Sequence, residues 1–162
     1  MNTGLSRTTL RAPSTVIPLV RQTVNDHDTS AAVRYCVVWD GAGVAIGDAR
    51  RAVRTLLARV GHPAEERASQ DAQLVVSELV TNAVRHAPGD GGLLLELTPD
   101  AGVLTVTVRD SSPSEPQQRP HDAGRVGGHG MYLVARLCER VQTVALADGK
   151  QVIARMVLNR TV

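Results

Sequence analysis

The sequence predicts an α/β two-layer sandwich, in which a mixed, mostly antiparallel sheet carries its helices on one face. Two observations lead to this prediction. Segments in which apolar and polar residues alternate are interspersed with three amphipathic segments of helical period. Consecutive strand-like segments are joined by tight turns at 100–102 and 148–149, which favours antiparallel pairing. With 162 residues, 43% of them hydrophobic, the chain can build one domain around a buried core.

The N-terminal region is expected to lie outside the packed domain. Residues 1–30 are rich in Thr, Ser and Arg and show no sustained hydrophobic period. We therefore predict a poorly ordered tail over 1–30, which contributes at most one edge strand near residues 16–20. The packed domain is predicted over 31–162.

The first half of the domain is predicted to contain one strand and two helices. Residues 33–39 (VRYCVVW) are rich in β-branched side chains and predict a strand. Over 44–60, apolar residues recur every three or four positions between arginines, which predicts an amphipathic helix. A second helix is predicted to begin near Ala64, with two glutamates in its first turn, and to end before Pro88.

A hairpin and a long loop come next. Residues 93–98 and 103–110 alternate with period two on either side of a turn, and they predict two paired strands. Residues 111–127 contain three prolines and almost no apolar side chains. A loop of this length is typical of a functional lid or of a disordered segment. The chain then continues with a third predicted helix over 131–140 and two last strands over 143–147 and 152–158.

Composition excludes several classes of protein. No stretch approaches about 18 consecutive apolar residues, so no membrane span is predicted, and no secretory signal is visible, which favours the cytoplasm. The formal net charge is only +2, aromatics make up 2% and the basic residues form no run, so direct nucleic-acid binding is not expected. Cys36 and Cys138 belong to no CxxC motif or Cys/His ladder, which predicts two reduced thiols and no structural zinc.

One face of the second predicted helix carries polar residues beside its apolar stripe. Glu78, Asn82 and His86 are spaced four residues apart, which confines them to an arc of about 80°. This face offers a carboxylate, an amide and an imidazole to a ligand. The simpler alternative is a solvated helix face.

Two further signals stand at the ends of predicted elements. Asp110 closes the second hairpin strand, where a lone acid is either a turn residue or part of a site. Gly128, His129 and Gly130 directly precede the third helix. Glycines at a helix start let backbone N–H groups approach a phosphate, although a flexible linker has the same appearance. The chain has no Walker A loop, because its only lysine is Lys150.

The order of these signals resembles a known family. The segments SELVTNAVRHAP (77–88), VTVRD (106–110) and GGHGMYLV (127–134) are similar to motifs of one ATP-binding domain. Gyrase-type topoisomerases, ninety-kilodalton heat-shock chaperones, sensor histidine kinases and MutL repair proteins share that domain, which has the Bergerat (GHKL) fold. The resemblance covers about residues 35–158. Within the superfamily the chain looks like the small, stand-alone anti-sigma-factor serine kinases of bacteria.

The resemblance implies roles for the polar residues of the second helix and of the strand end. Asn82 would be the Mg²⁺ ligand, and Glu78 would be the general base toward an attacking serine hydroxyl or water. Asp110 would accept a hydrogen bond from the adenine amino group. His86 matches a further position of the nucleotide site, and residues 111–127 would close as the ATP lid.

The resemblance also implies how the phosphates are held. Gly128, His129 and Gly130 would form the glycine box, whose backbone amides bind the phosphates. Kinase members carry an arginine at the position that is Val126 here, and Arg125 stands one residue earlier. Arg125 is therefore the candidate for stabilising the transferred phosphoryl group.

These roles imply an ATP-binding anti-sigma regulatory protein with ATP and Mg²⁺ as cofactors. Such a protein would bind a sigma factor, phosphorylate a serine on an anti-sigma antagonist and form a homodimer. One departure favours an alternative. The family's first glycine box reads Asp-x-Gly-x-Gly, whereas residues 110–114 read Asp-Ser-Ser-Pro-Ser. Glycines permit a close approach to the purine. Without them, the chain could be a degenerate, non-catalytic module that uses the same fold to bind a protein partner.

Overall fold

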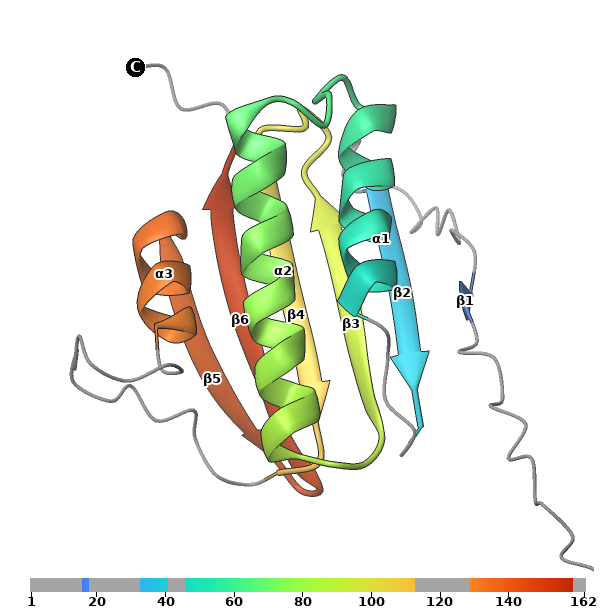
Figure 1. Cartoon of the computed structure of the whole chain (residues 1–162), viewed down its shortest axis with the longest axis vertical. Helices are drawn as coiled ribbons and strands as arrows, with labels where there is room; N and C mark the ends of the chain where they lie inside the picture. Colours follow the sequence, from blue (N-terminus) through green and yellow to red (C-terminus); the bar gives the residue numbers. More distant parts are fainter. Residues whose placement is uncertain (1–15, 18–32, 41–45, 113–128, 159–162) are drawn as a thin grey trace, which may run out of the picture.

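In the computed structural model, the residues that the structure describes form six strands of one sheet and three helices that lie across one of its faces (Figure 1). The structure describes residues 16–17, 33–40, 46–112 and 129–158. The strands are β1 (Val16–Ile17), β2 (Val33–Trp39), β3 (Gly91–Leu97), β4 (Val103–Asp110), β5 (Arg140–Leu146) and β6 (Gly149–Val157). The helices are α1 (Ile46–Arg59), α2 (Arg67–His86) and α3 (Gly130–Leu137).

The sheet has the order β1-β2-β3-β4-β6-β5, and each neighbouring pair of these strands is antiparallel. Tight turns join β3 to β4 and β5 to β6, while α1 and α2 lie between β2 and β3 in the chain. This arrangement confirms the predicted two-layer sandwich with helices on one face. The edge strand expected near residues 16–20 is β1, and the rest of the predicted tail over 1–30 lies outside the described residues.

The core lies between the sheet and the helices. Alternation along β4 directs Leu104, Val106 and Val108 at the helix layer, where each is at most 2% exposed. Burying such a side chain contributes about 1.5–3 kcal/mol relative to leaving it exposed. Most of the core is Val, Leu and Ala, as expected of a chain without phenylalanine.

The helices are amphipathic. α1 packs beside α2, and α2 also contacts α3 and β4, so α2 is central to the helix layer. α1 buries Ala49, Ala52, Val53, Leu56 and Leu57. In the part of the chain that the structure describes, no helix is long and apolar enough to cross a membrane.

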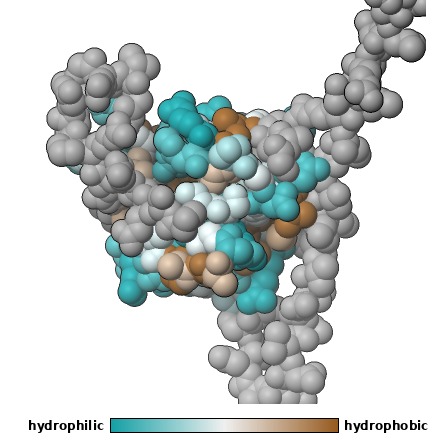
Figure 2. All heavy atoms as spheres, turned by 90° about the horizontal axis from the view of Figure 1, so that it is seen from below, coloured by the Kyte–Doolittle hydropathy of each residue, from teal (hydrophilic) through white to brown (hydrophobic). Residues whose placement is uncertain are grey.

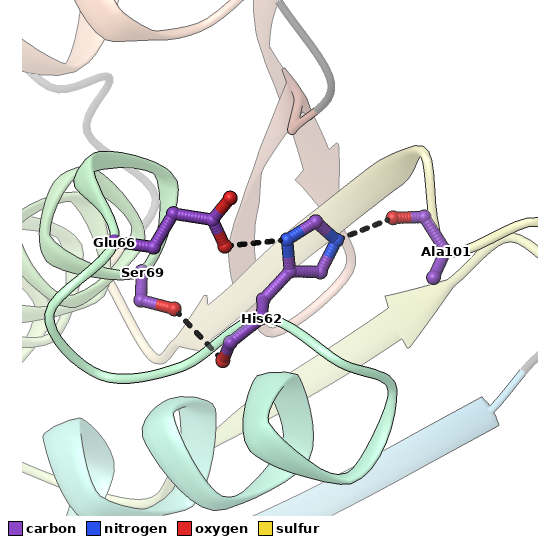
Figure 3. A network of polar contacts seen from close by, with 4 residues as sticks. All are labelled: His62, Glu66, Ser69 and Ala101. Atoms are coloured by element: carbon purple, nitrogen blue, oxygen red, sulfur yellow. Dashed lines mark hydrogen bonds and ion pairs between the residues drawn. The ribbon is translucent and has the colours of Figure 1, made fainter.

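The start of α2 differs from the prediction. The helix begins at Arg67, three residues later than expected, and the prediction that Glu65 and Glu66 lie in its first turn was wrong. The Glu66 carboxylate instead lies 2.9 Å from His62 Nδ1, while His62 Nε2 lies 3.1 Å from the Ala101 carbonyl oxygen (Figure 3). Glu66 therefore helps to tie the α1–α2 loop to the β3–β4 turn and does not cap the helix with its side chain.

The end of α3 also differs. The helix ends at Leu137, before the predicted end near residue 140, and β5 begins at Arg140. Cys138 is extended, and the Glu139 N–H donates to the Arg155 carbonyl of β6 at 2.8 Å. Arg140 pairs with Arg155 as well, so pairing with β6 extends β5 towards its N-terminus. The helical period of the sequence cannot show where α3 ends and β5 begins, because this boundary depends on pairing with β6, a strand that comes later in the chain.

Candidate functional site

The polar face predicted for α2 lies beside the packed stripe of that helix. Glu78 and Asn82 are half-buried, whereas His86, in the last turn, is exposed. In the described ranges, no hydrogen bond or ion pair joins the side chain of Glu78 or Asn82 to another residue. A carboxylate and an amide one helical turn apart are therefore available to a ligand. The neighbouring stripe buries Ala72, Val75, Val76, Leu79, Val80 and Ala83.

Glu78 lies against the start of α3. A Cβ atom at Gly130 would overlap Oε2 of Glu78, so the Glu78 carboxylate occupies the space that a side chain at residue 130 would take. The first backbone N–H groups of a helix lack intrahelical partners and carry a partial positive charge. The structure thus brings together two predicted site residues that are far apart in the sequence, a carboxylate and the glycine that opens a helix.

Asp110, at the end of β4, is held in a buried ion pair. Lys150 of β6 is its cross-strand neighbour, and Lys150 Nζ donates to Asp110 Oδ1 at 2.9 Å. The Ser112 N–H donates to the same oxygen at 2.9 Å, and Lys150 Nζ also donates to the Ser112 carbonyl at 3.2 Å. Asp110 and Lys150 are each only 5% exposed. Buried charges of this kind are found where they are paired, so Lys150 offsets the cost of burying Asp110.

Lys150 is not among the site residues that the sequence predicted. Alternation along β6 could have found it, because Lys150, Val152 and Ala154 share the buried face and Lys150 is the charged member. The other 17 of the 18 basic residues are arginines. Residue 150 therefore differs from every other basic position of the sequence, because it carries a compact ammonium group with three donors and not a larger guanidinium.

The remaining predicted site residues are exposed or not described. His129 is exposed and occupies the N-cap position of α3, where its carbonyl accepts the Leu133 N–H at 2.9 Å. Arg125, Gly128 and residues 113–127 of the predicted lid lie outside the described residues.

The described site residues gather towards one end of the molecule. In Figure 1 the C-terminal end of α2, the end of β4, the start of β6 and the start of α3 all lie in the lower half. Figure 2 views the molecule from this end and shows hydrophilic residues beside residues of intermediate and hydrophobic character. The contact between His62 and Ala101 lies at the opposite end, in the loops above the sheet.

A magnesium ion bound together with phosphates fits the residues of this site. Within the described ranges, no three His, Cys, Asp or Glu side chains gather in a way that could hold a metal ion. The donor that fits is the amide oxygen of Asn82, because it is partly accessible and has no partner in this part of the chain. Mg²⁺ usually keeps several waters and takes one or two protein groups plus phosphates. A metal centre made by protein ligands alone does not fit the described residues.

A comparison with protein families agrees with this fold and site. The sequence matches the model of the histidine kinase-like ATPase domain over residues 42–156, which is well over half of the chain. The chain belongs to the histidine kinase-like ATPase domain family. No curated protein matches the sequence. The family predicted from the three motifs is therefore confirmed, while the narrower resemblance to anti-sigma serine kinases stays a prediction.

Proposed function

We propose that the chain is an ATP-binding regulatory protein of the anti-sigma type, which acts in the cytoplasm, binds a sigma factor and phosphorylates a serine on an anti-sigma antagonist. The placement of Glu78 and Asn82 carries the proposal. Both side chains are half-buried on α2 and have no partner in the described part of the chain, and Glu78 lies against Gly130. Membership of the histidine kinase-like ATPase domain family supports ATP as the ligand.

In this proposal the nucleotide is held at both of its ends. Asn82 provides the protein ligand to Mg²⁺, which when bound neutralises charge on the phosphates. Asp110 accepts a charge-assisted hydrogen bond from the adenine amino group. Backbone N–H groups at the start of α3, together with that of Gly128, bind the phosphates. His86 and His129 are proposed as further contacts to the nucleotide.

Glu78 is the general base of the proposed transfer. The serine Oγ of the antagonist attacks the terminal phosphorus of ATP, so that the Oγ–P bond forms, the bond from that phosphorus to the bridging oxygen breaks, and ADP leaves. Glu78 accepts the proton of the serine hydroxyl as this bond forms. Arg125 is proposed to stabilise the charge of the transferred group.

The test of ATP binding is the free energy of unfolding with and without Mg-ATP. A ligand at about 100 times its dissociation constant adds about 2.7 kcal/mol when it binds only the folded protein. We expect a rise of this size with saturating Mg-ATP, and a smaller one when EDTA removes the metal. An unfolding curve that does not move in millimolar Mg-ATP would contradict ATP binding.

A second candidate function is a non-catalytic module that binds a protein partner. It is favoured by the segment after Asp110, where serines and a proline at residues 111–114 take the place of the family's glycines. On this alternative the stability does not respond to Mg-ATP, and a partner binds equally well with and without nucleotide. The unfolding measurement therefore separates the two candidates.

The proposal includes a homodimer, which follows from the family resemblance alone. Sedimentation velocity of the full chain measures it directly. We expect a concentration-dependent dimer, and a monomer at all accessible concentrations would remove this part of the proposal.

A further inference from the structure

One row of residues crosses the helix-facing side of the sheet at its candidate-site end. The row contains Trp39 of β2, Gly91 of β3, Asp110 of β4 and Lys150 of β6. Trp39 pairs with Gly91, and Asp110 pairs with Lys150. A Cβ atom at Gly91 would overlap the indole of Trp39, so the ring lies over this glycine. The buried indole and the charged pair therefore lie in one row, with β3 between the strands that carry Trp39 and Asp110.

The two carboxylate oxygens of Asp110 have different surroundings. Oδ1 accepts from Lys150 Nζ and from the Ser112 N–H, both at 2.9 Å. Oδ2 has no donor among the described residues. No fully buried side-chain oxygen or nitrogen in this part of the chain lacks a hydrogen-bond partner. Oδ2 is therefore the oxygen of Asp110 that remains for a ligand, and the residue as a whole is 5% exposed.

Lys150 Nζ is bound in turn by two acceptors. It donates to Asp110 Oδ1 and to the Ser112 carbonyl at 3.2 Å, and its side chain is 6% exposed. The ammonium group is thus directed at the protein and holds the carboxylate, the strand end and the first residues of the following loop together. Two of the three donors of the ammonium group are used in this way, which suits a group that orients an acceptor.

We infer that Lys150 is the positioning residue that sets the base specificity of the nucleotide site. Together with the Ser112 N–H, it holds Oδ1 and leaves Oδ2 as the acceptor for an incoming base. A lone acceptor suits the exocyclic amino group of adenine, whereas guanine carries a carbonyl at that ring position and would set acceptor against acceptor. This inference rests on the proposed ATP binding and adds to it the residue that makes the site prefer adenine over guanine.

The test is the ratio of the dissociation constants for Mg-GTP and Mg-ATP. It is measured by calorimetric titration, with the fluorescence of Trp39, the only tryptophan, as a second readout. We expect the wild type to bind ATP at least about tenfold more tightly than GTP. Lys150→Met should weaken ATP binding and lower the ratio, because the acceptor of Asp110 is then less firmly oriented, and Lys150→Arg should restore part of the preference because it keeps the charge and the donors.

Arg109→Met is the matched control. Arg109 precedes Asp110 on β4 and pairs with Asp148 at 2.8 Å, but it is exposed on the other side of the sheet. Like Lys150→Met, Arg109→Met deletes a positive charge and an ion pair at this end of the sheet. We expect it to leave the ratio of the two dissociation constants unchanged. A merely structural role for Lys150 would lower stability in urea without changing the ratio.

A second pair of variants decides the question if Lys150→Met does not fold. In Asp110→Asn, Lys150 should still bind Oδ1 and so turn the amide nitrogen towards the base, which reverses the preference to GTP. Adding Lys150→Met to Asp110→Asn should weaken that reversal, because only the Ser112 N–H then holds Oδ1. If the wild type binds neither nucleotide, the proposed ATP binding is wrong and the role of Lys150 falls with it. If the wild type prefers ATP and the ratio is the same with and without Lys150, only the inference on Lys150 is overturned.

Discussion

Asn82 and Glu78 share a face of α2, yet they would act at different stages of the proposed reaction. A metal ligand acts as soon as the nucleotide is bound, whereas a general base acts mainly in the transition state. We therefore expect Asn82→Ala to weaken Mg-ATP binding by at least about tenfold, and Glu78→Ala to keep the affinity but lose phosphotransfer. Calorimetric titration and a transfer assay measure the two effects. Gln70→Ala, an exposed position at the other end of α2, is the control. Equal losses of affinity in both variants would contradict this division.

The overlap between a side chain at residue 130 and the Glu78 carboxylate gives a second prediction at the scale of single residues. The carboxylate is the end of a flexible side chain, so Gly130→Ala should fold and displace it. Alanine exceeds glycine in helix stability by roughly 0.5–1 kcal/mol. We expect Gly130→Ala to raise the free energy of unfolding of the Glu78→Ala protein. In the wild type, the effect of Gly130→Ala on this free energy should be less favourable by at least about 0.5 kcal/mol. Urea unfolding of the four proteins measures this coupling. Additive effects would show that the two residues do not contact each other.

At the scale of elements, His62 joins the loop before α2 to the β3–β4 turn. Its ring contacts the Glu66 carboxylate and the Ala101 carbonyl, and the backbone carbonyl of His62 accepts from Ser69 Oγ at 3.2 Å (Figure 3). Ala101 adopts a φ of 54°, which alanine rarely does, so the turn is held in place by its surroundings. The His62 residue is 8% exposed. These contacts form a clasp, defined by His62, Glu66 and Ala101, that fixes two connections at one end of the sheet.

We expect His62→Ala to lower the free energy of unfolding by about 1–3 kcal/mol, because polar groups at the clasp lose their partners. The exposed His86 at the other end of α2 gives the comparison, since His86→Ala should change the stability by no more than about 0.5 kcal/mol. Urea unfolding measures both. Because the clasp lies at the end opposite to the candidate site, Mg-ATP affinity should be the same in folded His62→Ala as in the wild type. A large loss of affinity would contradict the separation of the two ends.

At the scale of the whole molecule, patterns that depend on sequence neighbours predicted most of the fold. Alternation located β4, and a period of three to four located α1 and α2, because both patterns follow from local backbone geometry. Contacts between distant segments could not be predicted in this way. The start of β5 at Arg140 depends on β6, and the clasp at His62 depends on a turn about forty residues away. In the site, Glu78 and Asn82 carry a local signal, whereas the role of Lys150 depends on the register of β4 and β6.

One thiol is expected to make the stability of the whole fold depend on pH. Cys138 follows α3 and packs against the core, and burial raises its pKa from 9.0 to about 12. Well below pH 9 the thiol is protonated in the folded and the unfolded chain and contributes no pH dependence. Between about pH 9 and pH 12 it ionises only in the unfolded chain, so unfolding releases a proton and the stability falls as the pH rises.

The test is the free energy of unfolding in urea between about pH 8 and pH 10.5, under reducing conditions. The contribution of Cys138 to the slope can reach at most about 1.4 kcal/mol per pH unit, and the partial exposure of the residue makes it smaller. We expect Cys138→Ala to show a shallower decline above pH 9 than the wild type, because it lacks the group that ionises on unfolding. Cys36→Ala, which removes the other thiol from β2, should retain the decline that Cys138 causes. If the wild type and Cys138→Ala lose stability in parallel above pH 9, the decline comes from other groups and Cys138 does not control it.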